Sequence, residues 1–406
     1  MLRKSLSIFI KLLYIIIIKY LFIKMKIFIF TSLLFLILSS EIPSVQEVMN
    51  YISTITNKSI RIKKIKVWAL QDFWEHELMP SVSKYLFEDI EMIENIAPEG
   101  NPNRPGDKHE KKYITVHDTG DFAYTAGQWS KHVYDAKIGN TSYEVSFQYV
   151  VGNDGYYHNI PDDETAYHAG DGATAASLFQ EYETGVYGDK KKPHVSISTD
   201  GYYVIEGKKT IVKAPTDDKG NILTEKDFND MGIYTTIKDG MYYIGSTWYS
   251  TTYKKIGNHG GNTNSIGIES CVNKGSDIYF TIQRLAKLVA KLMDDNNFSM
   301  DQIVQHHYFS GKDCPQTMRT EGYWNHFLGL VEVEYQMLQF KKMGFTFQLI
   351  PINSNYINEV GRVINRGNNF TMNASFMIIV TDPDGYELKR VFTTSIPSRI
   401  KYTDSE

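Results

Sequence analysis

The sequence predicts an α/β protein with a mixed central β-sheet flanked by helices, followed by a small C-terminal β-sandwich. Between residues 110 and 340, short runs of β-branched and aromatic residues alternate with segments whose apolar residues have helical spacing. From Gly344 to about Ile400, strand-like segments follow one another, separated by turns such as residues 382–385. At 406 residues, the chain is long enough for two domains.

Residues 1–40 have the composition of an export segment. Two apolar runs, 8–23 and 27–38, are broken only by lysines. The second run has the length of a signal-peptide core and ends at Ser39 and Ser40, small residues that suit cleavage. An uncleaved anchor is the alternative, because the first run approaches the roughly 20 residues that span a bilayer. We expect cleavage and a secreted protein without a membrane partner; both alternatives place the remaining chain outside the cytoplasm.

The composition is that of an ordinary globular protein, with 42% hydrophobic and 22% charged residues, and argues against general disorder. Residues 1–40 hold six basic residues and no acidic ones, so their removal changes the formal net charge from −4 to −10. Such an acidic chain is not attracted non-specifically to nucleic acid or anionic lipid. We therefore expect no nucleic-acid partner, and we expect a monomer.

The two cysteines, Cys271 and Cys314, are too few for a disulfide-stapled scaffold. One interpretation joins them in a single disulfide. The other leaves Cys314 free to bind a metal and Cys271 merely buried.

The first part of the chain leads into the main domain. Residues 41–109 form an N-terminal lead-in, in which residues 41–75 mix polar and apolar positions and residues 96–106 form a loop rich in Pro, Gly and Asn. Residues 113–116 are β-branched or aromatic, which predicts a buried strand that leads to His117. Thr125 is a suitable N-cap for a helix over residues 126–136.

A hairpin, a loop and an insertion come next. Residues 147–151 and 156–160 predict a β-hairpin, because the Gly-Asn-Asp-Gly sequence between them is typical of a turn. The loop over residues 165–172 carries His168. Residues from about 186 to 256 are polar, rich in Lys and Tyr, and punctuated by turn pairs, which predicts a β-rich insertion in the 110–340 domain.

The remaining elements complete the main domain. Residues 265–272 predict a core strand that holds Glu269 as its one charged residue. Thr281 is predicted to cap the next helix. Residues 303–304 predict a short strand before His306, and residues 323–341 predict a last helix, after which residues 344–406 form a separate module.

His117, His306 and Cys314 are candidate metal ligands. Both histidines follow predicted strands, and strand ends are where α/β folds gather site residues. His306 and Cys314 are eight positions apart in a loop whose turn near Ser310 could bring both onto one ion. Two imidazoles and a thiolate suit Zn²⁺ with a fourth position open to water.

Five segments together resemble the type 2 N-acetylmuramoyl-L-alanine amidases, a family that includes phage endolysins, bacterial autolysins and animal peptidoglycan recognition proteins. The resemblance covers roughly residues 110–335 and depends on segments 113–120, 146–160, 164–172, 262–273 and 304–315. It implies the mixed-sheet fold of these proteins. It also implies zinc-dependent hydrolysis of the amide between N-acetylmuramic acid and L-alanine in bacterial peptidoglycan.

The resemblance assigns the zinc ligands by position. It makes His117, His306 and Cys314 the ligands, because the family places its ligand histidine eight residues before the cysteine. His307 is then a neighbour that does not bind the metal.

The same resemblance implies roles for residues around the metal. Lys312 would stabilise the oxyanion and Glu269 would act as general base. Tyr167 and His168 would contact the substrate, with Tyr167 standing where relatives often have tryptophan. Phe147 stands where some members have a catalytic tyrosine, and members without that tyrosine carry the carboxylate that corresponds to Glu269.

Two other functions remain open. A recognition module would bind muropeptides without cutting them, but non-catalytic relatives typically lose a zinc ligand, and this chain keeps all three. A cysteine hydrolase would use Cys314 or Cys271 as nucleophile. The lysine and the proline that flank Cys314 favour a ligand role instead.

Overall fold

The computed structural model describes residues 42–56, 64–67, 74–77, 82–136, 145–169, 181–191, 193–214, 216, 221–222, 233, 235–245, 260–310, 312–319, 323–367, 370–396 and 398. The predicted export segment, 1–40, lies outside these residues. Among the helices in these ranges, none combines the length and the apolar character needed to cross a membrane.

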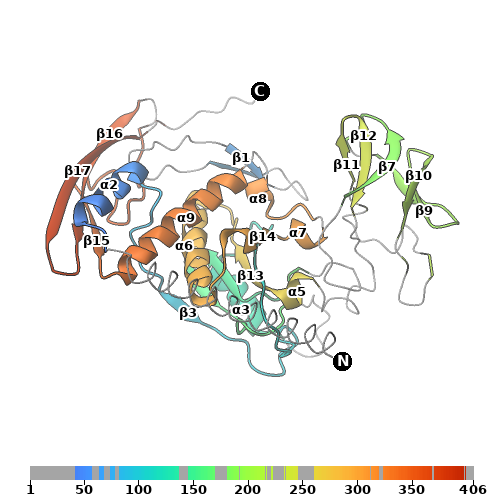
Figure 1. Ribbon diagram of the computed structural model, residues 1–406, viewed down its shortest axis with the longest axis horizontal. Coiled ribbons are helices and arrows are strands. Elements are labelled where there is room, and N and C mark those ends of the chain that lie inside the picture. Colours follow the sequence, from blue (N-terminus) through green and yellow to red (C-terminus); the bar gives the residue numbers. More distant parts are fainter. Residues whose placement is uncertain are drawn as a thin grey trace, which may run out of the picture.

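A six-stranded mixed sheet forms the centre of the main domain, which confirms the predicted fold class (Figure 1). Its strand order is β14-β4-β13-β5-β6-β3. Strands β14, β4, β13 and β5 pair in parallel, β6 returns antiparallel to β5 through the predicted hairpin, and β3 is parallel to β6. The strands span β3 (Met92–Glu94), β4 (Tyr113–Asp118), β5 (Tyr149–Gly152), β6 (Gly155–His158), β13 (Ser265–Ser270) and β14 (Ile303–Gln305).

The two faces of this sheet are covered by different helices. On one face, Ile114 and Val116 of β4 join the main hydrophobic core with residues of α6 (Ile278–Asn296) and α9 (Tyr323–Lys342). Because side chains alternate along a strand, Thr115 and His117 face the other side. The strand over 113–118 therefore uses one face for the core and leaves the other for polar residues.

Helix α3 (Ala126–Tyr134) packs against β5 and β6 on that second face. Thr125 precedes the helix as predicted, and its backbone N donates to the Gln128 side chain at 2.9 Å. Val133 of α3 and Val150 of β5 are fully buried in one cluster that also contains Phe147 and Cys271. This cluster shields part of the second face of the sheet from water, next to the polar residues Thr115 and His117 of β4.

The predicted cap of α6 is wrong. Asp277 caps this helix, since its carboxylate accepts a hydrogen bond from the backbone N of Phe280 at 3.2 Å. Thr281 lies inside the helix, where its hydroxyl accepts from the Asn153 side chain at 2.8 Å. The helix begins about one turn earlier than predicted because all residues of its first turn are buried, and the core fixes their conformation.

The stretch predicted as a β-rich insertion, together with the residues from Glu181 just before it, contains two three-stranded antiparallel sheets, in the orders β10-β9-β8 and β11-β12-β7. They enclose a small core of their own around Tyr203, Tyr242 and Ile244. Figure 1 shows these strands to one side of the central sheet. Their bounds are β7 (Glu181–Tyr187), β8 (Val195–Ile197), β9 (Tyr202–Ile205), β10 (Lys208–Lys213), β11 (Thr235–Lys238) and β12 (Met241–Gly245).

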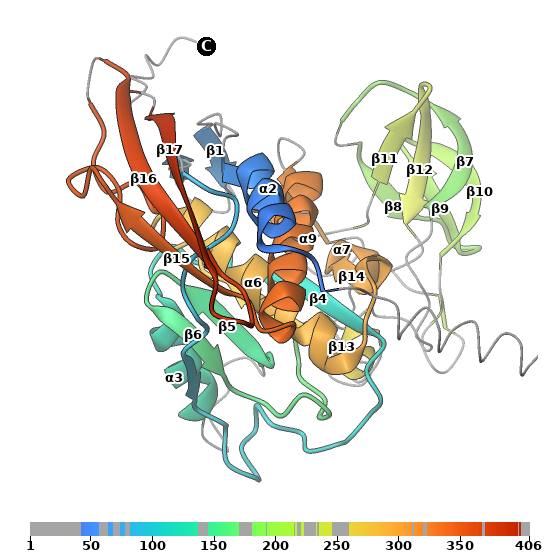
Figure 2. The ribbon, with the colours of Figure 1, turned by 60° about the vertical axis from the view of Figure 1, so that its left-hand side comes forward.

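The C-terminal strands form one antiparallel sheet, made of β15 (Thr346–Pro351), β16 (Met372–Thr381) and β17 (Glu387–Ile396). The predicted antiparallel strands are confirmed. Within the described ranges, however, the layer facing them is helix α2 (Val45–Thr56) and not the second sheet of a sandwich (Figure 2). Residues of α2, of these strands and of the C-terminal half of α9 share one core, so the lead-in and the tail are joined through packing.

The other elements are short. Strands β1 (Lys64–Val67) and β2 (Trp74–Glu77) pair antiparallel. Four short helices lie at loops of the main domain: α5 (Gly261–Asn264), η2 (Met300–Gln302), α7 (His307–Ser310) and α8 (Gln316–Arg319).

Candidate metal centre

Three candidate ligands converge from three places in the fold. His117 lies on β4, His306 directly follows β14, and Cys314 lies in the loop between α7 and α8. The parallel pairing of β14 with β4 places Gln305 opposite Val116. The backbone N of His306 then donates to the carbonyl of Val116 at 3.3 Å. Sheet pairing therefore brings His306 beside His117 across 189 positions of sequence.

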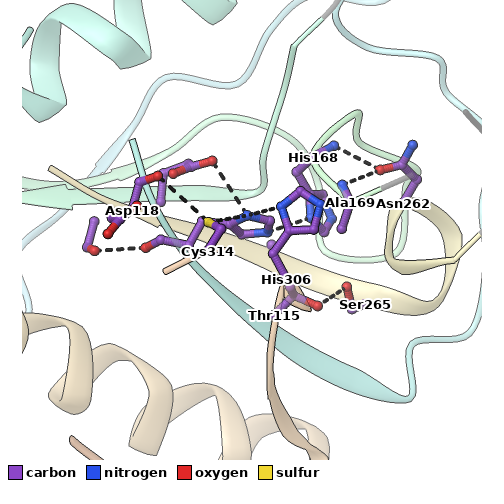
Figure 3. A network of polar contacts seen from close by, with 12 residues as sticks. Thr115, Asp118, His168, Ala169, Asn262, Ser265, His306 and Cys314 are labelled. Atoms are coloured by element: carbon purple, nitrogen blue, oxygen red, sulfur yellow. Dashed lines mark hydrogen bonds and ion pairs between the residues drawn. The ribbon is translucent and has the colours of Figure 1, made fainter. Parts of the chain in front are cut away.

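The donor atoms of the three residues lie close together and are buried. Figure 3 shows two of these residues, His306 and Cys314, within the cluster. Nδ1 of His117 is 3.1 Å from Nδ1 of His306 and 3.7 Å from Sγ of Cys314. A tetrahedral zinc ion at its usual bond lengths separates two nitrogens by roughly 3.4 Å and a nitrogen from a sulfur by roughly 3.6 Å. The His117, His306 and Cys314 donors, each at most 4% exposed, therefore fit a zinc ion.

The protonation of the two imidazoles also suits a metal. Burial, together with neighbouring positive groups, holds the pKa of His117 and of His306 well below the usual histidine value. Both rings are therefore neutral at pH 7, which is the form that binds metal. Burial raises the pKa of the Cys314 thiol, so a cation nearby is needed to favour its thiolate.

The cysteines are not joined. Cys271 and Cys314 are both free in the structure, and Cys271 lies in the apolar cluster beside Phe147. The disulfide interpretation is thus wrong for this structure. The alternative, a buried Cys271 apart from a Cys314 placed among metal ligands, matches the observed positions.

Asp118, the residue after His117, holds the segment that follows Cys314. Its Oδ2 accepts hydrogen bonds from the backbone N of Thr317 at 2.8 Å and from the Thr317 hydroxyl at 2.9 Å. Asp118 is itself buried. Sequence reasoning assigned this residue no role, although its place directly after a candidate ligand was a signal.

Glu269 lies beside His117 at the candidate metal centre. It stands opposite His117 in the parallel pairing of β13 and β4, and its Oε1 is 3.8 Å from Nδ1 of His117. Burial raises the pKa of Glu269 to about 8, although the charge of Lys312 opposes this shift. A carboxyl group with such a pKa can both take and give a proton near neutral pH.

Lys312 and His307 lie in the loop that carries Cys314. Lys312 is half-buried, and its charge lowers the pKa of Glu269 and of His306, so its ammonium group acts on the centre. His307 is not part of the ligand cluster; its Nδ1 lies 3.2 Å from the carbonyl O of Lys312. The ring of His307 thus contacts the loop backbone.

The two predicted substrate contacts differ in their exposure. Tyr167 is half-buried, and its backbone N donates to the Ser146 hydroxyl at 2.9 Å. His168 is only 7% exposed, and its Nδ1 lies 2.9 Å from Nε2 of His117. Burial lowers the pKa of His168 to about 3, so this ring is neutral. The structure therefore places His168 against a candidate ligand.

Asn262 and Gly267 lie next to His168. The sequence alone suggested no role for either residue. Oδ1 of Asn262 accepts hydrogen bonds from the backbone N of His168 at 2.9 Å and of Ala169 at 2.6 Å (Figure 3). A Cβ atom added at Gly267 would lie 2.6 to 2.7 Å from the His168 ring. Their presence within the 262–273 segment was the only sequence signal.

Comparison with known proteins gives one matching family model and several curated relatives. The family model, described as N-acetylmuramoyl-L-alanine amidase, matches residues 107–317, just over half of the chain. The amidase CwlH of Bacillus subtilis strain 168 is 25% identical over 239 residues, which are 59% of this chain and 60% of CwlH. The amidase CwlA of the same organism is 34% identical over 80 residues, which are 19% of this chain and 29% of CwlA.

Several solved structures are also similar. The structure of the catalytic domain of XlyA aligns with 60% of this chain and 99% of that chain, at 21% identity and a TM-score of 0.36. This chain therefore spans less than two thirds of the length of the curated relatives named here: 60% of CwlH and 29% of CwlA.

Proposed function

Because the chain belongs to the N-acetylmuramoyl-L-alanine amidase family, we propose that it hydrolyses the amide between N-acetylmuramic acid and L-alanine in bacterial peptidoglycan. The observation that carries this proposal is the buried cluster of His117, His306 and Cys314 with Glu269 beside it. A module that only recognised muropeptides would not need a complete ligand set next to a carboxyl group.

We propose that His117, His306 and Cys314 hold Zn²⁺ through the three donor atoms that face one another. Zinc bound there would supply a Lewis acid that activates water and the amide carbonyl at neutral pH. Asp118 keeps the Cys314 segment in place through Thr317, so the thiolate is presented by a rigid turn.

Amide hydrolysis also requires proton transfer and stabilisation of the oxyanion, and Glu269 and Lys312 supply these. An amide has a poor leaving group, so the departing nitrogen must receive a proton. The Glu269 carboxylate takes a proton from the attacking water and gives it to this nitrogen. Lys312, whose charge acts on Glu269, stabilises the negative charge that develops on the carbonyl oxygen. Tyr167 is the proposed substrate contact at the edge of the site.

The proposed activity takes place outside the cytoplasm, where peptidoglycan lies. Residues 1–40 direct the chain there, and after cleavage the protein is secreted and acts as a monomer. The remaining chain carries a net negative charge, which disfavours binding to nucleic acid.

Digestion of purified bacterial cell walls tests the proposed activity. New free L-alanine amino groups should appear without new reducing sugar ends. A chelator should abolish their release and added Zn²⁺ should restore it. Release of reducing ends would indicate a glycosidase, binding to walls without any release would indicate a recognition module, and chelator-resistant release would contradict the zinc mechanism.

A further inference from the structure

We propose that His168 is a positioning residue for the metal ligand His117, which it holds in the orientation that binds the ion. This inference rests on the proposed metal site and adds a residue to it. It replaces the substrate contact that the sequence suggested for His168, because this side chain is only 7% exposed.

The two ring nitrogens of His117 face different partners. Its Nδ1 is the atom that faces His306 and Cys314, at 3.1 and 3.7 Å. When one imidazole nitrogen binds a metal, the other carries a proton and needs an acceptor. Nδ1 of His168 lies 2.9 Å from this second nitrogen, Nε2, and the two rings stand at 89° to each other. With a metal on Nδ1 of His117, its Nε2–H would therefore donate a hydrogen bond to Nδ1 of His168.

His168 is itself fixed, through backbone hydrogen bonds to Asn262 and the packing of its ring over Gly267. Asn262 accepts hydrogen bonds from its backbone N and from that of Ala169, which anchors the loop in front of the sheet. The ring lies directly over Gly267, where a Cβ atom would come within 2.6 to 2.7 Å of three ring atoms. Only glycine leaves room for the imidazole at this place on β13.

Two segments far apart in the sequence serve this one contact. The 164–172 loop supplies His168, and the 262–273 segment supplies both Asn262 and Gly267. Gly267 is fixed in turn, because its backbone N donates to the Gln148 side chain at 2.7 Å. Ligands of metal sites usually donate to a carboxylate, a carbonyl or water. In this centre a buried imidazole takes that place.

Zinc affinity, measured by competition with a chromogenic chelator, tests the inference independently of turnover. His168→Ala should weaken zinc binding by roughly 10- to 100-fold, the usual effect of removing such a partner. His168→Gln, whose amide oxygen can accept the same hydrogen bond, should recover most of the affinity. The exposed His109 gives a matched control, and His109→Ala should bind zinc like the unchanged protein.

A double-mutant cycle with Gly267 separates positioning from general damage. Gly267→Ala should weaken zinc binding when His168 is present, because the added methyl group displaces the ring. In the His168→Ala background the same change should have little further effect, since the ring is gone. Equal losses from Gly267→Ala in both backgrounds would show that the glycine acts on the strand and not through His168.

The outcomes distinguish this inference from the proposed function. If the unchanged protein binds zinc and cuts cell walls while His168→Ala and His168→Gln bind zinc normally, the inference is overturned and the function stands. An increased KM with unchanged zinc affinity would return His168 to the role of substrate contact. If the unchanged protein binds no zinc, the metal site fails and this inference fails with it.

Discussion

Oε1 of Glu269 lies 3.8 Å from Nδ1 of His117, because the two residues stand opposite each other on neighbouring parallel strands. Paired strands are about 4.8 Å apart, so the sheet itself sets the distance between the carboxyl group and the candidate ligand His117. The same sheet face carries Gly267, which makes room for His168. Strand β13 therefore carries both the proposed general base, Glu269, and the glycine beside which His168 packs at the candidate metal centre.

Replacing Glu269 should separate metal binding from turnover. Glu269→Gln keeps the shape of the side chain but cannot shuttle a proton, so zinc content should remain and kcat should fall by roughly 10²- to 10⁴-fold. Zinc stoichiometry and the rate of L-alanine amino-group release measure the two effects. The exposed Glu91 provides the control, and Glu91→Gln should be fully active. A nearly normal rate for Glu269→Gln would assign the general base to another residue.

The two cysteines should respond differently to substitution. Cys314→Ala removes a proposed ligand and should lose both zinc and activity. Cys271→Ala removes a buried thiol from the Phe147 cluster and should keep the metal, at the cost of a modest loss of stability. Metal analysis after dialysis makes the comparison. Retention of stoichiometric zinc by Cys314→Ala would refute its role as a ligand.

Glu334 should be one of the most important polar residues for stability. Its carboxylate is 2.8 Å from Nζ of Lys287 and accepts a hydrogen bond from the backbone N of Leu86 at 2.8 Å, and both charged side chains are buried. Glu334→Ala would leave a buried ammonium group unpaired, so the free energy of unfolding should fall by roughly 3–5 kcal/mol. Urea unfolding measures this change.

An exposed ion pair gives the control for Glu334. Lys108 and Asp163 also lie 2.8 Å apart, but both side chains are more than half exposed. Asp163→Ala should therefore lower the free energy of unfolding by less than about 1 kcal/mol. Similar losses for Glu334→Ala and Asp163→Ala would contradict the importance of burial.

His158 should make stability depend on pH. Its Nδ1 is 2.8 Å from Glu94 and its Nε2 is 3.4 Å from Asp162. Burial lowers the pKa of His158, but the two carboxylates outweigh it and the net shift is upward from 6.5. The folded chain then binds the proton more tightly than the unfolded chain. This stabilisation is complete below about pH 6.5 and is lost as the pH rises through the raised pKa.

His158→Gln should remove that part of the pH dependence. Urea unfolding from about pH 5.5 to 8.5 should show a steeper loss of stability for the unchanged protein than for the variant. The difference between the two proteins isolates His158 from other groups that titrate in this range. Parallel curves would show that the carboxylates do not raise its pKa.

Much of the fold could be predicted because local patterns report local conformation, and the three candidate ligands singled out from the sequence do cluster. The run of β-branched and aromatic residues at 113–116 predicted β4, and turn residues predicted the β5–β6 hairpin. The cap of α6 was misplaced because Thr281 and Asp277 are both good capping residues, and only burial of the first turn selects Asp277. The layer over the C-terminal sheet was misjudged because strand periodicity shows that one face is buried but not what covers it.

The sequence by itself determined strands β4, β5, β6, β13 and β14 of the central sheet, but not β3, and it singled out the trio of His117, His306 and Cys314, since residue type and spacing limit both secondary structure and metal chemistry. Only the tertiary structure decided that His168 faces Nε2 of His117 and that Glu269 stands opposite His117. These contacts join residues 51 and 152 positions apart. They depend on which strands pair and on the room that a glycine leaves, and packing of the whole domain decides both.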